Sequence, residues 1–289
     1  MKNKIIYPKV VDFGVNSECH YNCRYCFGPK LIKSLSFEKI KDIVYKFKNL
    51  NCQLMAITGG EPLLRNDIAQ ILELINSLNI KISISTTGKL FFKYVDTINK
   101  CVQHIGLPVD WDSEEFTYKE NGALQDVLNI LEYYKNRPNR PIIKIGTVCT
   151  KENLHKLNDI GKLLAKYNKS IDIWKIYQFI PRGKNAVINR KDLEITSQEF
   201  LKGVDGIESK FSSYFSIVIS PRELRASAYF LVNPNGDVFT PLDNGVNCKE
   251  EVIGNLISDN WDKILSKWSN IISVDNYMEN IKKTFRISS

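Results

Sequence analysis

The sequence has no long apolar run, few histidines and no tract of low complexity. Charged residues make up 25% of its 289 residues, and no apolar stretch reaches the length of about 18 residues needed to cross a bilayer. Residues 1–8 also lack the apolar core of a secretory signal. We therefore expect a cytoplasmic protein with no membrane partner.

The sequence also lacks an internal repeat and a Gly/Ser linker. Its formal net charge is +8, and the lysines are spread along the whole chain. This spread favours a solvated, lysine-rich surface over a stripe that binds nucleic acid, so we do not expect a nucleic-acid partner. The length suits one large core with a short extension, because single cores stop growing near roughly 250–300 residues.

The seven cysteines fall into two groups. Cytosolic thiols are kept reduced, so a disulfide framework is not expected, and clustered thiols there more often bind metal. Three cysteines are clustered: Cys19, Cys23 and Cys26. The other four are scattered, and we expect them to be small buried apolar residues: Cys52, Cys101, Cys149 and Cys248.

Short β-branched runs alternate with longer amphipathic segments over the first two thirds of the chain. This alternation is typical of βα units and a parallel sheet. We expect strands at residues 10–15, 54–58, 81–86, 105–109, 142–149 and 171–179. The sequence therefore predicts an α/β fold with a partial (β/α)6 barrel over residues 1–190, whose ligands lie at the carboxyl ends of the strands.

After residue 190 the pattern changes to short strands and turns. Segments 215–220, 228–233 and 237–240 have the composition of antiparallel strands, with a turn at residues 233–237. We therefore expect a small α+β C-terminal extension over residues 191–289 that caps the open side of the barrel.

The clustered cysteines lie on a loop directly after the first expected strand. Thiolates suit zinc or iron–sulfur clusters, and three of them leave one metal valence without a cysteine. His20 could complete a zinc site, but a residue adjacent to Cys19 points poorly at the same metal. The pattern favours an iron–sulfur cluster that can chelate a small molecule.

The spacing CxxxCxxC, with Tyr25 before the last cysteine, resembles the signature of the radical S-adenosylmethionine (SAM) superfamily. The GGEP element of that family is matched at the end of the second expected strand, by Gly59, Gly60, Glu61 and Pro62. The two elements meet at the same rim of a barrel, which makes the pair more specific than either alone.

The resemblance implies that Cys19, Cys23 and Cys26 bind one 4Fe–4S cluster. Reductive cleavage of SAM at the reduced cluster would give methionine and a 5′-deoxyadenosyl radical, which abstracts a hydrogen atom from a substrate. The cofactors supply this chemistry, and the protein supplies binding, orientation and exclusion of water. An electron donor such as flavodoxin or ferredoxin would be the redox partner.

The same resemblance implies the SAM contacts. The GGEP element receives the amino group, and Ser85 and Thr87, at the end of the third strand, contact the ribose and carboxylate. Thr87 replaces the family's usual asparagine, and a hydroxyl can still make such bonds. Pro108 stands where many members have a polar SAM contact. Lys119 is a candidate partner for the SAM carboxylate, with a solvated surface lysine as the alternative.

The C-terminal extension resembles the SPASM or twitch extension of peptide-modifying relatives, which holds a second cluster. The cysteine expected near Pro241 is missing, and Cys248 alone cannot provide four-cysteine ligation. We therefore expect a degenerate cap without an auxiliary cluster.

A cap without a cluster is similar to the viperin-like branch of the superfamily, which acts on nucleoside triphosphates. That resemblance implies four substrate contacts: Lys144, Lys175, Gln178 and Tyr229. The chain departs from that branch at three positions: Leu54, Gly146 and Gly28.

The two lysines belong to strands whose alternation places them on the inner face of the barrel. An inward lysine without a partner is costly or loses its proton, so an anion such as phosphate is one explanation for Lys144 and Lys175. The other explanation is an ion pair with a barrel carboxylate such as Asp110.

Three functions remain open. The first is a radical SAM enzyme that acts on a nucleoside triphosphate or a similar small anion. The second is a radical SAM enzyme that modifies a peptide or another metabolite. The third is a non-catalytic iron–sulfur protein, which would have no need of the GGEP element.

Overall fold

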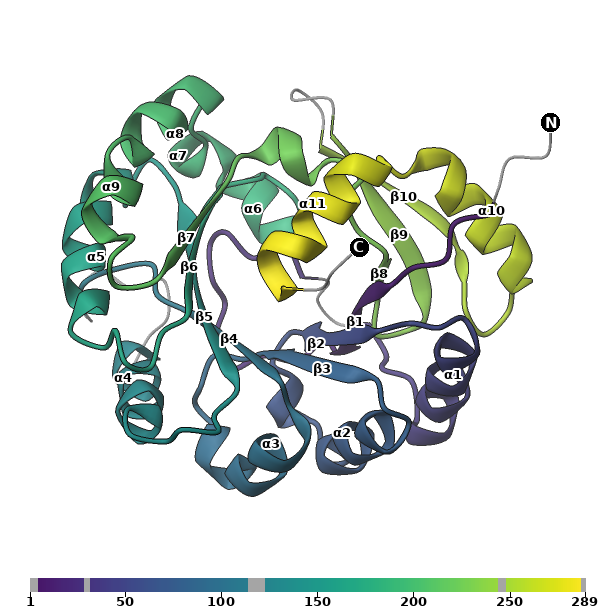
Figure 1. Cartoon of the computed structure of the whole chain (residues 1–289). Coiled ribbons are helices and arrows are strands. Elements are labelled where there is room, and N and C mark those ends of the chain that lie inside the picture. Colours follow the sequence, from purple (N-terminus) through teal and green to yellow (C-terminus); the bar gives the residue numbers. More distant parts are fainter. Residues whose placement is uncertain (1–4, 29–31, 114–122, 244–247, 287–289) are drawn as a thin grey trace.

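A computed structural model describes residues 5–28, 32–113, 123–243 and 248–286. Within these residues the chain folds around one ten-stranded sheet, with most of its helices outside the sheet and α11 (Val274–Phe285) inside its arc (Figure 1). The strand order is β10-β9-β8-β1-β2-β3-β4-β5-β6-β7, and in the described residues the two edge strands do not pair with each other. The predicted α/β class is confirmed, and the sheet is an open arc rather than a closed barrel.

The sheet is mostly parallel. Its parallel strands are β1 (Val10–Asn16), β2 (Leu54–Gly59), β3 (Lys81–Ser85), β4 (His104–Pro108), β5 (Ile142–Cys149), β6 (Ile173–Gln178) and β7 (Ser216–Ser220). The short β8 (Leu231–Val232) also pairs in parallel with β1. The remaining two strands are antiparallel: β9 (Asp237–Asp243) and β10 (Cys248–Asn255).

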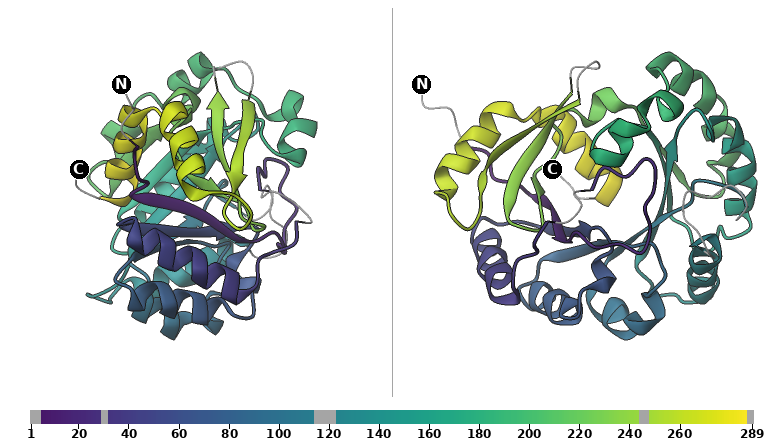
Figure 2. Two further views of the ribbon diagram at one scale, coloured as in Figure 1. Left: turned by 90° about the vertical axis from the view of Figure 1, so that its right-hand side faces the viewer. Right: turned by 180° about the vertical axis from the view of Figure 1, so that it is seen from behind.

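Helices cover the outer side of this arc, as two further views show (Figure 2). An apolar stripe anchors each of the longer helices; in α1 it consists of Ile40, Ile43, Val44 and Phe47. The helices that follow β1–β5 are α1 (Phe37–Asn49), α2 (Ile68–Ser77), α3 (Val95–Cys101), α4 (Ala123–Tyr134) and α5 (Leu157–Ala165). Single 3-10 turns precede α2, α3 and α5: η1 (Pro62–Leu64), η2 (Phe91–Lys93) and η4 (Leu154–Lys156).

The prediction of an antiparallel strand at residues 215–220 is wrong. Ser216 lies opposite Ile173 and Ser220 opposite Tyr177, so β7 is a parallel neighbour of β6. Four short helices between the two strands form a crossover connection, which returns the chain in the same direction. They are α6 (Lys184–Ile188), α7 (Arg190–Leu193), α8 (Ser197–Val204) and α9 (Ile207–Phe211).

Strands from both sides of residue 190 share the one sheet. The last part of the chain adds β7 at one edge and β8, β9 and β10 at the other. It also contains η5 (Arg222–Arg225), α10 (Trp261–Ile271) and α11 (Val274–Phe285). The division into a barrel and a cap at residue 190 stays a prediction.

Helix α11 crosses the space enclosed by the arc of strands (Figure 1). Its Tyr277 hydroxyl accepts a hydrogen bond from the Val10 amide at 2.7 Å and donates one to the Val10 carbonyl at 3.2 Å. The Phe285 ring packs edge-on against His104 with the ring centroids 6.0 Å apart. Since Val10 and His104 begin β1 and β4, α11 closes the end of the arc at which the strands start.

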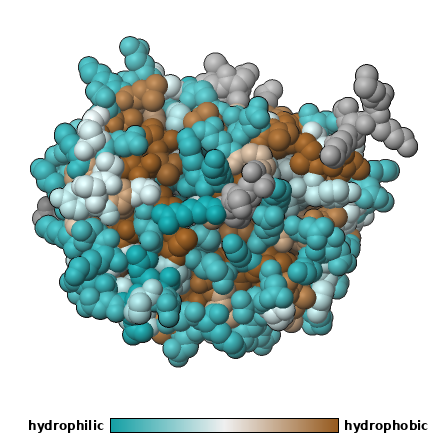
Figure 3. All heavy atoms as spheres, viewed as in Figure 1, coloured by the Kyte–Doolittle hydropathy of each residue, from teal (hydrophilic) through white to brown (hydrophobic). Residues whose placement is uncertain are grey.

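Hydrophilic side chains cover most of the face that carries α11, with hydrophobic patches between them (Figure 3). Among the described helices, none is long and apolar enough to cross a membrane.

The contact between α11 and β4 predicts a pH dependence of stability. Burial, together with the charges of Lys144 and Lys81, lowers the pKa of His104 to about 4. Its pKa in the unfolded chain is about 6.5, so the unfolded state binds the extra proton and stability falls as the pH drops below that value. Between about pH 7.5 and about pH 5.5, we expect the free energy of unfolding of the wild type to fall by about 1.3 kcal/mol more than that of His104→Leu.

Urea unfolding of the cluster-loaded protein at both pH values measures this difference. The exposed His155 provides a control, because His155→Leu should keep the pH dependence of the wild type. Identical pH dependences in wild type and His104→Leu would show that His104 is not held neutral at this contact.

Candidate functional site

A cavity of about 410 Å³ lies inside the arc of strands. Its wall combines the loop after β1, the ends of β2 and β3, and inward-facing residues of β1, β4, β5 and β6. Arg225 of η5, residues around β8 and the last turns of α11 complete it. Segments that are far apart in sequence therefore form one site.

The loop after β1 brings all three clustered cysteines to the cavity. Cys19, Cys23 and Cys26 line its wall as thiols rather than half-cystines. The loop is anchored to the end of β2, because the Gly60 amide donates to the Asn16 carbonyl at 2.6 Å. The prediction that the other cysteines are buried is confirmed for Cys52, Cys101 and Cys149, and the side chain of Cys248 lies outside the described residues.

The backbone around Asn16–Glu18 approaches residues 59 and 60 so closely that both must be glycine. A Cβ atom on Gly59 would lie 2.1 Å from the Asn16 carbonyl oxygen, and one on Gly60 would lie 2.2 Å from the Glu18 carbonyl oxygen. Gly59 also has a φ of +135°, which other residues rarely adopt. The two glycines therefore bring exposed backbone to the cavity wall, next to the cysteines.

Glu61 is fully buried, and in the described structure neither Glu61 nor Pro62 lines the cavity. The Glu61 carboxylate accepts hydrogen bonds from the Leu63 amide at 3.0 Å and the Thr86 hydroxyl at 2.7 Å. It also accepts from the amide and the hydroxyl of Thr87, at 2.6 and 2.7 Å. The side chain of Glu61 thus joins the ends of β2 and β3, rather than facing a ligand.

The other residues expected to contact SAM have different placements. Ser85 and Thr87 line the cavity next to the two glycines. Tyr25 also lines it, and its hydroxyl donates to Asp110 at 2.5 Å. Burial and the Asp110 charge raise the pKa of Tyr25, which keeps the phenol protonated. Lys119 lies outside the described residues.

Both lysines point into the cavity, as predicted. The Lys175 side chain is 3% exposed, and its ammonium donates to Asn280 at 2.9 Å and to Thr284 at 2.5 Å, both on α11. The Lys144 ammonium lies 5.4 Å from the centre of the Phe285 ring and donates no hydrogen bond to any described residue. Burial lowers the pKa of both lysines.

Among the described contacts of the two lysines, none involves Asp110, the carboxylate named as an example of an ion-pair partner. One of its oxygens accepts from Tyr25 and the other from the Val148 amide at 2.9 Å. The carboxylate that faces the lysines is Asp12, on the inner side of β1. Burial raises the pKa of Asp12 to about 6, while the charges of Lys144 and Lys175 oppose the rise.

Gln178 has a bracing role in the structure. Its amide donates to the Ile195 carbonyl at 3.1 Å and accepts from the Arg222 amide at 3.1 Å, so both of its functional atoms are already engaged by protein groups. Gln178 nevertheless lines the cavity, and so does Tyr229, from the segment just before β8. All four residues expected to contact substrate therefore line one cavity, and Gln178 is the one whose amide oxygen and nitrogen both bond to protein groups.

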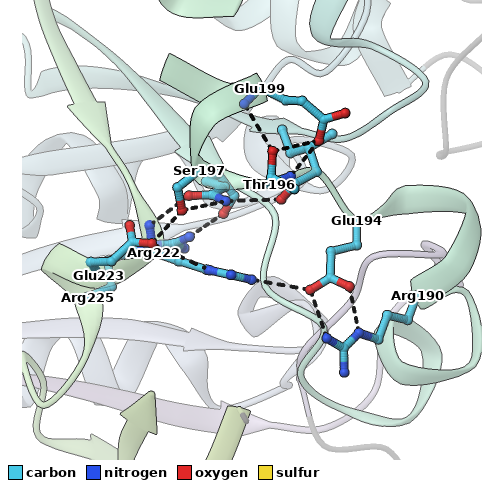
Figure 4. A network of polar contacts seen from close by, with 10 residues as sticks. Arg190, Glu194, Thr196, Ser197, Glu199, Arg222, Glu223 and Arg225 are labelled. Atoms are coloured by element: carbon cyan, nitrogen blue, oxygen red, sulfur yellow. Dashed lines mark hydrogen bonds and ion pairs between the residues drawn. The ribbon is translucent and has the colours of Figure 1, made fainter. Parts of the chain in front are cut away.

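Arg225 also lines the cavity, although no local motif marks it. Its guanidinium donates to the Gln178 carbonyl and stacks 5.5 Å from the centre of the Tyr177 ring. A network of ion pairs holds η5 in place (Figure 4), in which Glu194 binds Arg222 at 3.2 Å and Arg190 at 2.6 Å. Arg182, from the loop after β6, lines the same cavity.

Comparison with known proteins identifies the family. The family model of the Radical SAM superfamily matches residues 15–164. A probable GTP 3′,8-cyclase of Archaeoglobus fulgidus is 32% identical over 254 residues, which cover 81% of this chain and 77% of the relative. The chain therefore belongs to the radical SAM superfamily: it is an enzyme that uses a 4Fe–4S cluster and SAM.

Further relatives differ in what their names say they act on. An S-adenosylmethionine-dependent nucleotide dehydratase of Fibrobacter sp. is 23% identical over 270 residues, covering 80% of this chain and 77% of the relative. Streptococcus suis SuiB bound to SAM has a TM-score of 0.67 at 15% identity, covering 96% of this chain and 68% of SuiB. The protein anSMEcpe, with bound AdoMet and a peptide, has a TM-score of 0.68 at 17% identity, covering 93% and 84%. The two structures show that the fold is shared.

The bonds of Glu61 predict a loss of stability in Glu61→Gln. The amide of glutamine would direct two N–H groups at a pocket in which the backbone and hydroxyl partners are already donors. Leaving such buried groups unpaired costs about 1–3 kcal/mol each, so we expect a total loss of about 2–4 kcal/mol. Glu38→Gln, at an exposed position on α1, should change stability by less than about 0.5 kcal/mol.

Urea unfolding of the cluster-loaded variants tests this prediction. Wild-type stability in Glu61→Gln would show that the carboxylate does not hold the two strand ends together.

Proposed function

We propose that this radical SAM enzyme acts on a small anionic substrate, a nucleoside triphosphate. The observation that carries the proposal is the charge of the cavity wall, which has four cationic side chains and two carboxylates among its described residues. The cationic residues are Lys144, Lys175, Arg182 and Arg225. Cations in a partly closed cavity favour an anionic ligand, because burial without a counter-charge is costly.

In this proposal Cys19, Cys23 and Cys26 bind the cluster. Three thiols on one loop at the cavity wall suit such a cluster, and they would leave one iron without a cysteine ligand, where SAM would bind. When bound, the cluster and SAM would supply the chemistry, a one-electron reductive cleavage of SAM whose products would be methionine and a radical able to take a hydrogen atom from the substrate. The protein would orient SAM and the substrate relative to each other and exclude water.

SAM would lie along the strand ends. The backbone of Gly59 and Gly60 is open to the cavity, and the hydroxyls of Ser85 and Thr87 stand beside it. We propose that these groups bind the amino acid and ribose parts of SAM, and that Glu61 acts by fixing their backbone. Tyr25 packs the cysteine loop against Asp110.

The substrate would occupy the opposite wall, formed by β5, β6, η5 and α11. We propose that residues 191–289 act as the cap, without an auxiliary cluster, and supply Arg225 and Tyr229 to this wall. The names of two relatives, a nucleotide dehydratase and a GTP cyclase, support a nucleotide. The electron would come from a partner such as flavodoxin or ferredoxin.

The cysteine assignment predicts where the iron is bound. Replacing Cys19, Cys23 and Cys26 together with alanine should remove nearly all iron and visible absorption from the anaerobically reconstituted protein. The buried Cys101 is the matched control, because Cys101→Ala should retain the iron of the wild type. A full complement of iron in the triple variant would place the cluster on other residues.

The substrate assignment predicts selective protection by nucleotides. In the presence of SAM, a nucleoside triphosphate at 100 times its dissociation constant should stabilise the wild type by about 2.7 kcal/mol. Lys144→Met removes the cation that lacks a described hydrogen-bond partner, and we expect a loss of at least about tenfold in affinity, or about 1.4 kcal/mol. Lys100→Met changes an exposed lysine and should have no effect.

Anaerobic thermal unfolding and calorimetric titration measure both quantities. Equal nucleotide affinity in the wild type and a well-folded Lys144→Met protein would contradict the proposal. If a peptide rather than any nucleotide protected the wild type, the enzyme would be a peptide-modifying member of the superfamily.

A further inference from the structure

Three polar groups face the cavity without using their hydrogen-bonding capacity on the protein. They are the Asp12 carboxylate and the hydroxyls of Tyr177 and Tyr229, and within the described part of the chain none of them makes a hydrogen bond. Asp12 lies opposite Leu231 across the pairing of β1 with β8, which brings Tyr229 close to it. Asp12 and the two tyrosines also influence one another electrostatically.

The position of Tyr177 is fixed by its neighbours. Two cations pack against its ring: the Lys175 ammonium lies 5.0 Å from the ring centre and the Arg225 guanidinium 5.5 Å from it. Lys175 is in turn held by α11, and Arg225 by the end of β6. The Tyr177 hydroxyl is therefore presented to the cavity by a rigid support.

The charges around Asp12 limit what can bind there. Phosphate is disfavoured at an ionised carboxylate, and with its pKa at about 6 Asp12 is mostly ionised at neutral pH. A ligand ammonium is disfavoured by Lys144, Lys175 and Arg225, which surround the same space. The group that suits Asp12 is therefore a neutral hydrogen-bond donor, and the two phenols can both donate to it and accept from it.

We infer that Asp12, Tyr177 and Tyr229 form a subsite for the hydroxyl groups of a sugar, next to the cations that receive the phosphates. A carboxylate that accepts from a ribose hydroxyl is a common way of binding nucleotides. The inference rests on the proposed function and narrows its substrate to a ribonucleotide, because a deoxyribose lacks one of the donors. The sugar subsite also explains why a carboxylate, Asp12, lies beside cations that receive phosphates.

The experiment compares four probes on the holoenzyme with SAM. They are the tightest-binding common ribonucleoside triphosphate, its 2′-deoxy form, its 3′-deoxy form and inorganic triphosphate, titrated anaerobically by calorimetry. The wild type should bind the ribonucleotide at least about tenfold more tightly than one of the deoxy forms, which corresponds to one lost hydrogen bond at a buried site.

Asp12→Asn should reduce the ratio of the deoxynucleotide and ribonucleotide dissociation constants to less than about threefold. Its affinity for inorganic triphosphate should be unchanged or higher, because a repulsive charge is removed. Tyr229→Phe removes one hydroxyl without a change of charge and should also reduce the ratio, which keeps the test valid if Asp12→Asn folds poorly. Asp42→Asn, at an exposed position on α1, should keep the wild-type ratio.

The outcomes separate this inference from the proposed function. If phosphate probes bind but the wild type does not distinguish ribose from both deoxyriboses, the sugar subsite is wrong and the anion site stands. A ratio unchanged in both Asp12→Asn and Tyr229→Phe also overturns the subsite. If neither a nucleotide nor inorganic triphosphate binds the wild type, both the proposed function and the subsite fail.

Discussion

The structure of the site depends on the contacts that Glu61 makes in three directions. Its carboxylate holds the end of β3 through Thr86 and Thr87. Its amide donates to the Glu18 carbonyl at 2.7 Å, and its carbonyl accepts from the Asn16 side chain at 3.2 Å. One buried residue thus ties the cysteine loop to the ends of two strands. The approach is close enough that the two preceding residues must be glycine.

A second constraint acts at the opposite end of the strands. Helix α11 closes the start of the arc and supplies Asn280 and Thr284 as acceptors for the buried Lys175 ammonium. With Lys175 held by the protein, Lys144 is the lysine available to a ligand. The last helix of the chain is therefore part of the site, and it sets the depth to which a ligand can enter.

Local sequence patterns predicted the parts of this structure that depend on neighbouring residues. The βα alternation gave the central strands, and the pairing of a cysteine loop with a Gly-Gly turn gave the rim of the site. Alternation along β5 and β6 also placed Lys144 and Lys175 on the inner face, where the structure has them. These features follow from the period of two along a strand and from the fixed position of strand ends.

Features that depend on distant contacts were not predictable in this way. The bond between Lys175 and Thr284 joins residues 109 positions apart, and no local signal marks it. The composition of β7 suits either strand direction, and only the crossover through α6–α9 makes it parallel. Asp12 does carry a local signal, because it is the only charged residue of β1. Glu61 was recognised by its motif, but a motif does not show which way a side chain points.

The central claim is that a nucleotide occupies the cationic wall and is attacked from the cluster side. The most direct measurement is the transfer of deuterium to 5′-deoxyadenosine from a nucleoside triphosphate deuterated at its carbon-bound positions, in anaerobic reactions of the reduced holoenzyme with SAM. The account predicts deoxyadenosine formation above the level with SAM alone, with deuterium in the product. Deoxyadenosine that no nucleotide stimulates and that contains no deuterium would contradict it.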